Sequence, residues 1–216
     1  GMDDIRRNAA LFRDALNWVN NPNNKIGSYP NVVMGISMGG LVARYALRKM
    51  EMDGMGHHTW KYISMDTPHK GANLPAGLQA MTRHLTSIDL QYRGVPVFSV
   101  SFLEPAREAL KVLNSTAAKQ MLIYNVTPDG RGFDNSVHTN FSNELEQMGL
   151  PAKTQNVAVT NGSLQDVNLF APGSPIIACN EKLGLNFGQE LLNIFIASEL
   201  GLMLMGETNY AGVFLL

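Results

Sequence analysis

The sequence has little of what several common classes of protein require. Of its 216 residues only one is a cysteine, Cys179, which excludes an internal disulfide framework and a cysteine-based metal cluster. We expect Cys179 to be a small buried apolar residue. The formal net charge is only −1, without the basic character of a nucleic-acid-binding protein. The apolar stretch 189–205 is interrupted by Glu190 and Glu199, so no segment has the roughly 20 uncharged residues that span a membrane.

What the chain does contain is enough apolar sequence for one globular α/β domain. Its residues are 45% hydrophobic, and we predict a single domain over residues 1–216. Residues 74–150 break the alternation of strands and helices, with helical stretches at 78–85 and 105–122. We interpret these helices either as a lid or cap insertion or as plain packing helices on the sheet. The segment 189–216 is a strongly apolar C-terminal stretch.

The first 65 residues alternate helix, strand, helix and strand. Residues 3–19 have apolar side chains at helical spacing, and 29–35 form a short apolar run typical of a strand buried in a parallel sheet. A helix at 41–52 and a strand at 60–65 complete a βαβ unit with parallel strands. A further apolar strand is predicted at 155–160. The apolar stripe of the first helix consists of Ile5, Ala9, Phe12, Leu16 and Val19.

The most informative motif is a Gly-x-Ser-x-Gly sequence placed directly between an apolar strand and a helix. In this context the motif predicts a sharp turn with Ser37 at its tip, in a strained conformation. Gly35 and Gly39 lack Cβ atoms, so the strand and the helix can approach closely, and Gly40 extends the elbow. The helix N-terminus favours developing negative charge, and the Met38 N–H is the expected oxyanion donor. Ser37 is therefore the candidate nucleophile.

The segments GISMGGLVARYAL and SMDTPHKGA together resemble the alpha/beta-hydrolase superfamily. In its lipase and esterase members, a G-x-S-x-G-G elbow precedes a strand that ends in (D/T)-(S/T)-P-H-x-G. The chain is most similar to a group of large bacterial hydrolases of the Bacteroidetes type. These share the entry helix Asp-Asp-Ile-Arg-Arg-Asn-Ala and a later strand that ends in Asn-Gly-Ser. The resemblance is strong over residues 3–75 and loose over 104–165.

This resemblance implies a parallel sheet flanked by helices and a serine hydrolase that acts on carboxylic esters or lipid-like substrates through an acyl-enzyme. It implies no metal and no organic cofactor. In complete members several strands precede the elbow, and the loop after the third strand supplies a second oxyanion N–H. Here only one predicted helix precedes it. We therefore expect a fold that is incomplete at the N-terminus, and an esterase that is weak or inactive in this form.

The partners of Ser37 are less well defined than the serine itself. The superfamily order is Ser, then Asp or Glu, then His. Asp66 ends the second strand, and Asp166 follows the strand at 155–160, which is the commoner position for the acid. No histidine follows Asp166, whereas His138, on a predicted loop after Pro-Asp-Gly-Arg-Gly, follows Asp66. His138 is the candidate base, with an ordinary structural histidine as the alternative.

The loop after the second strand contains two candidate substrate-binding residues. Thr67 and His69 belong to the T-P-H-x-G motif, and the resemblance implies that His69 shapes the pocket rather than accepts the proton. Asp66 can equally be a carboxylate that caps this turn. We expect His57 and His58 to be solvated loop residues.

A second hypothesis places the chain in a different functional class. An alpha/beta-hydrolase fold can serve as a catalytically silent binding or assembly module, because fold alone does not determine function. A sheet with few strands also exposes an edge that favours pairing with another copy, so a homo-oligomer is a further expectation. The first residues do not read as a secretory signal, and the sequence indicates no compartment.

Overall fold

The computed structural model describes residues 2–25, 27–87, 91–92, 95–96 and 104–160. The chain divides into two compact units. Of the described residues, the first unit contains those within 2–76 and 114–160, and the second contains those within 77–113.

Three sequence predictions fall beyond the described part of the chain. Asp166, the commoner position for the acid, lies outside the described residues, as do Cys179 and the apolar segment 189–216. These predictions stay as they are.

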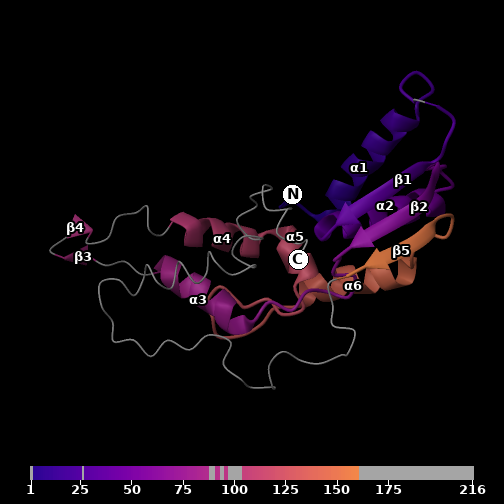
Figure 1. Ribbon diagram of the computed structural model, residues 1–216. Coiled ribbons are helices and arrows are strands. Elements are labelled where there is room, and N and C mark those ends of the chain that lie inside the picture. Colours follow the sequence, from indigo (N-terminus) through magenta and orange to yellow (C-terminus); the bar gives the residue numbers. More distant parts are fainter. Residues whose placement is uncertain (1, 26, 88–90, 93–94, 97–103, 161–216) are drawn as a thin grey trace. The chain divides into compact units, whose positions relative to one another are not determined.

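The first unit is built on a three-stranded parallel sheet with the order β1-β2-β5 (Figure 1). The strands are β1 (Asn31–Ile36), β2 (Thr59–Met65) and β5 (Gln155–Val159). Gly35 pairs with Ser64, and Ser64 in turn pairs with Ala158. The predicted βαβ unit is therefore confirmed: β1 and β2 are adjacent parallel strands, and a single helix connects them in the sequence. The protein belongs to the α/β class.

Four helices belong mainly to the first unit: α1 (Ile5–Asn20), α2 (Met38–Met52), α5 (Thr116–Met121) and α6 (Ser136–Met148). One core cluster joins α1 and α2 to the sheet, and a second joins α1, α2, α5 and α6. The first cluster is Leu16, Val33, Ala43, Leu47, Met50 and Tyr62. The second is Ile5, Leu41, Ala117, Phe141 and Leu145.

The predicted amphipathic helix is present as α1, with one exception. Ile5, Ala9 and Leu16 are buried, but Val19 is 41% exposed because it lies in the last turn, beyond the core cluster that ends at Leu16. Asp4 caps the helix: its carboxylate accepts a hydrogen bond from the Arg6 N–H at 2.8 Å.

The second unit contains α3 (Ala76–Ser87), the short antiparallel pair β3 (Gln91–Tyr92) and β4 (Val95–Pro96), and α4 (Glu104–Asn114). The prediction of one helical stretch over 105–122 is wrong in detail. The chain forms two helices there, because the Ser115 side chain accepts a hydrogen bond from the Ala118 N–H and starts α5 anew. None of the described helices has the length and hydropathy that crossing a membrane requires.

Burial along β1 alternates, contrary to the prediction of a strand covered on both faces. Val33 and Gly35 are buried, whereas Val32, Met34 and Ile36 are each more than half exposed. Val33 packs with residues of α1 and α2, which places these helices on the covered face. Within the described residues, the opposite face is solvent-accessible.

The entry to β5 is fixed by a buried carboxylate at the C-terminal end of α2. Glu51 accepts hydrogen bonds from the N–H groups of Ala152 at 2.8 Å and Lys153 at 2.7 Å, and from Arg48 at 3.0 Å. His57 Nε2 lies 3.3 Å from the same carboxylate. The prediction of a solvated His57 is wrong: its side chain is 3% exposed, because it is held between Glu51 and the backbone of β2.

We expect Glu51→Gln to lower the free energy of unfolding by about 1.5–3 kcal/mol near neutral pH, since hydrogen bonds to a charged acceptor are worth about that much. Burial alone would raise the pKa of Glu51, but the backbone N–H groups, Arg48 and His57 lower it below the usual glutamate value. A lowered pKa stabilises the fold above the usual value, and this stabilisation is lost as the pH falls through the lowered one. Urea unfolding at pH 7 and about pH 4 measures both effects.

Asp53→Asn is the matched control for this experiment. Asp53 follows Glu51 by two residues, at the C-cap of α2, but pairs with Lys49 at the surface, so its loss should change stability by less than about 1 kcal/mol. Equal effects of the two substitutions would contradict the structural role of Glu51.

Candidate functional site

Ser37 occupies the junction between β1 and α2 in a backbone conformation that few non-glycine residues adopt. Its φ is 51° and its ψ is −125°, and its N–H donates to the Met65 carbonyl at 2.8 Å. The predicted strained turn is therefore confirmed. The residue stands at the N-cap position of α2, but its hydroxyl does not cap the helix. Within the described part of the chain, the half-buried Ser37 side chain has no hydrogen-bond partner.

Two of the three elbow glycines are required by close packing. A Cβ atom at Gly35 would lie 2.5 Å from the Gly39 carbonyl carbon, and one at Gly40 would lie 2.0 Å from Thr67 Oγ1. The prediction that Gly39 must lack a Cβ atom for strand and helix to approach is wrong, because a Cβ there would meet nothing within 4 Å. The second close approach at the elbow is therefore between Gly40 and the loop after β2, and does not involve Gly39.

The first turn of α2 supplies the electrostatics expected of an oxyanion site. The Met38 N–H belongs to this turn, where unpaired N–H groups and the helix dipole favour negative charge. The Met38 side chain packs against the second core cluster. In the same turn, the Gly40 carbonyl accepts a hydrogen bond from the Tyr62 hydroxyl at 2.7 Å, and burial raises the pKa of Tyr62 to about 12.

The candidate acid Asp66 lies at the end of β2, on the same edge of the sheet as Ser37. Its φ is 47°, its N–H donates to the Val159 carbonyl at 2.7 Å, and its carboxylate accepts a long 3.4 Å bond from Thr160. The neighbouring Thr67 hydroxyl donates to the Met65 carbonyl at 3.3 Å. Asp66 has no histidine partner among the described residues.

His69 is held between Arg44 of α2 and Ser64 of β2. Arg44 approaches its Nδ1 at 3.5 Å and can only donate, so the neutral ring carries its proton on Nε2, which lies 3.0 Å from Ser64 Oγ. Burial, with the positive charge of Arg44, lowers the pKa of His69. Arg44 is itself buried, and donates to the Leu145 carbonyl at 2.7 Å and the Gly149 carbonyl at 3.1 Å.

His138 lies in the first turn of α6, so the predicted loop position is wrong. The loop after the Pro-Asp-Gly-Arg-Gly sequence is shorter than predicted, because α6 already begins at Ser136. His138 Nδ1 lies 2.8 Å from the Gln120 main-chain carbonyl. Its ring packs against Gly71, where a Cβ atom would lie 2.7 Å from His138 Cε1. His138, His69 and Leu41 are among the residues that line a small cavity of about 10 Å³.

The structure brings some of the predicted site residues together and leaves others apart. Ser37, Met38 and Asp66 share the carboxyl edge of the sheet, whereas no hydrogen bond joins Ser37 to His138 or His69 in the described ranges. Sequence reasoning missed Arg44 and Gln120, which position the two histidines, because no local motif marks them. Comparisons with protein-family models, curated proteins and solved structures found no match to this chain.

We expect Gly40→Ala to destabilise the protein by about 1–3 kcal/mol, the usual cost of overpacking, because the added methyl group collides with the whole Thr67 side chain. Gly39→Ala is the matched control. It should be neutral or stabilising by up to about 1 kcal/mol, since alanine favours helix and the site is open. Thermal unfolding of both variants tests this contrast, and equal losses of stability would contradict the packing described for Gly40.

Proposed function

We propose that the protein is a serine hydrolase of the lipase and esterase type, with Ser37 as its nucleophile. The observation that carries the proposal is the backbone of Ser37, whose φ of 51° and ψ of −125° present the hydroxyl at a sharp strand-to-helix turn. The hydroxyl is accessible and has no hydrogen-bond partner among the described residues. The alpha/beta-hydrolase identity of the sheet is part of this proposal.

The proposed reaction is acyl transfer through a covalent intermediate. Ser37 Oγ bonds to the ester carbonyl carbon while its proton passes to the base, and the carbonyl oxygen becomes an oxyanion that faces the Met38 N–H. Collapse of this intermediate breaks the ester bond, and the alkoxide leaves with the proton from the base. Water then attacks the acyl carbon while its proton passes to the base. The bond to Ser37 Oγ breaks, and the serine leaves with the proton from the base.

His138 is the proposed base, and the substrate is a carboxylic ester or a lipid-like small molecule. The position of α6 supports the choice of base, because the helix directly precedes β5 and starts at the carboxyl edge of the sheet, where Ser37 lies. Thr67 and His69 are proposed to shape the substrate side of the loop after β2. Of the two candidate acids, Asp66 has no histidine partner in the described part, and Asp166 lies outside it.

One observation favours the alternative of a catalytically silent binding module. In the described residues Ser37 has no histidine within hydrogen-bond distance, so the elbow stands without an assembled base. The two functions differ in the reactivity of Ser37 toward an electrophile.

Labelling with a fluorophosphonate probe distinguishes the two functions. We expect one probe molecule on the purified chain, attached to Ser37 and lost in Ser37→Ala, because only an activated serine attacks the phosphorus and displaces fluoride. Peptide mass spectrometry locates the adduct. A folded protein that stays unlabelled over hours, or an adduct on another serine such as Ser64, would contradict the hydrolase and favour the silent module.

A further inference from the structure

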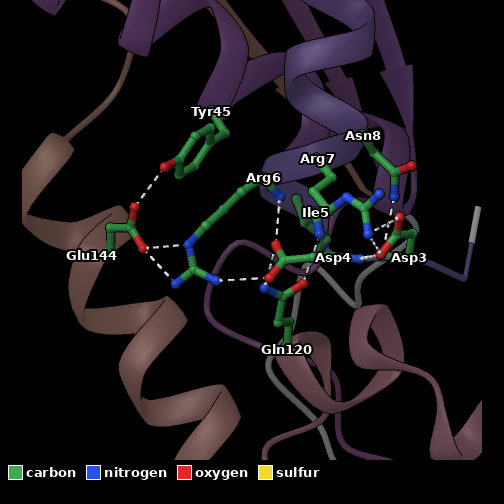
Figure 2. Close-up of polar contacts among 9 residues, drawn as sticks. All are labelled: Asp3, Asp4, Ile5, Arg6, Arg7, Asn8, Tyr45, Gln120 and Glu144. Carbon is green, nitrogen blue, oxygen red and sulfur yellow. Dashed lines mark hydrogen bonds and ion pairs between the residues drawn. The ribbon is translucent and has the colours of Figure 1, made fainter.

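Gln120 joins three segments of the first unit around His138. Its side chain is almost completely buried, at 1% exposed. The side-chain oxygen accepts the Ile5 N–H at 2.8 Å, and the side-chain nitrogen donates to the Asp4 carboxylate at 2.9 Å. Figure 2 shows this amide inserted at the N-terminus of α1, between Asp4 and Ile5. The main-chain carbonyl of Gln120 lies 2.8 Å from His138 Nδ1.

This contact determines which nitrogen of His138 carries the proton. A carbonyl oxygen can only accept, so the 2.8 Å contact requires a proton on Nδ1. In the neutral ring Nε2 is then the nitrogen with a free lone pair, which is the form a general base needs. Asp66 makes no such contact, because its carboxylate is turned to Thr160.

The packing of α6 on α2 places His138 at the level of Ser37. Tyr45 of α2 donates to Glu144 of α6 at 2.6 Å, and Arg44 binds the Leu145 carbonyl. One turn toward the N-termini, Leu41 and Phe141 share a core cluster. The two helices are therefore parallel and in register over these turns.

One turn further toward the N-termini of the two helices lie Ser37 and His138. Ser37 precedes Leu41 by four residues, about 6 Å, and His138 precedes Phe141 by three residues, about 4.5 Å. The two residues thus lie at adjoining helix ends on the carboxyl edge of the sheet. Catalytic hydrogen bonds of this kind are commonly long in unliganded sites and shorten when substrate binds.

We infer that the main-chain carbonyl of Gln120 orients His138, in the place where serine hydrolases usually have a carboxylate. This inference rests on the proposed function. His138 Nε2 takes the Ser37 proton as the Oγ bond to the acyl carbon forms. The resulting imidazolium keeps its Nδ1–H on the Gln120 carbonyl and returns the Nε2 proton to the leaving alkoxide. Gln120 is a positioning residue, and the Asp4 and Ile5 contacts hold its backbone in place.

The first measurement needs no substituted Gln120. Nitrogen-15 NMR of histidine-labelled protein reports the tautomer of each neutral ring, and the His138 signal is assigned by its absence in His138→Gly. We expect the tautomer with the proton on Nδ1. A proton on Nε2 of the neutral ring would overturn the inference, whatever the reactivity of Ser37.

The second measurement is the rate of fluorophosphonate labelling of Ser37. His138→Gly should slow it at least about 100-fold, the usual contribution of a general base, and added imidazole should restore part of the rate. A purely structural histidine would show no such rescue. Gln120→Leu keeps the carbonyl but removes the Asp4 and Ile5 contacts that hold it in place, so it should slow labelling by less than His138→Gly does. Asp3→Asn, a surface change at the same helix end, is the matched control and should stay within about twofold of the parent.

The outcomes separate this inference from the proposed function. Labelling of Ser37 at the parent rate in His138→Gly would overturn the inference and the choice of His138 as base, and would leave a hydrolase with Ser37 as its nucleophile. Asp66→Asn that slows labelling as much as His138→Gly would overturn it too, since a carboxylate would then orient the ring. A parent protein that is not labelled overturns both. Should Gln120→Leu fail to fold, the tautomer, the imidazole rescue and the Asp66 variant still decide the question.

Discussion

The close packing of the end of β1 on the first turn of α2 is the constraint on which the candidate site depends. Gly35 has no room for a side chain against the Gly39 and Gly40 backbone, so the chain must turn sharply over the three residues between Gly35 and Gly39. This turn forces Ser37 to positive φ, at a typical cost of about 1–3 kcal/mol. Two hydrogen bonds to β2 oppose this cost: the Ser37 N–H donates to the Met65 carbonyl, and the Gly40 carbonyl accepts from the Tyr62 hydroxyl.

The second constraint is the attachment of α6 to α2 through two arginines. Arg44 donates to the carbonyls of Leu145 and Gly149, and Arg48 donates to that of Met148, at the C-terminal end of α6, where a helix leaves carbonyls without intrahelical partners. Their positive charge also suits the negative end of the helix dipole. Because these contacts fix the C-terminal end of α6, they fix the direction of the helix, and with it the position of His138 at the opposite end.

Sequence reasoning predicted β1, α2, β2 and the strained Ser37 because their signals are local. Apolar periodicity and the elbow motif lie within about one βαβ unit, where spacing alone constrains the backbone. It did not predict the burial of His57 or the roles of Arg44 and Gln120, since each depends on a partner element that no local spacing identifies. Gln120 binds Ile5 across 115 positions of sequence, and Arg44 binds Leu145 across 101. The surroundings of Gly40 likewise depend on Thr67, from a different loop.

The energetics of Ser37 support the proposal that it is a nucleophile, because its position does not serve stability. A serine at an N-cap ordinarily bonds to the first-turn N–H groups and stabilises its helix by about 0.5–2 kcal/mol. Ser37 makes no such bond, and its backbone is strained as well. The helix therefore lacks the stabilisation of a cap, and the backbone is strained at one residue. The same arrangement leaves the hydroxyl without a hydrogen-bond partner at a helix N-terminus. A glycine would relieve the strain here without losing a cap bond, so a serine at this position supports the proposed role of its hydroxyl.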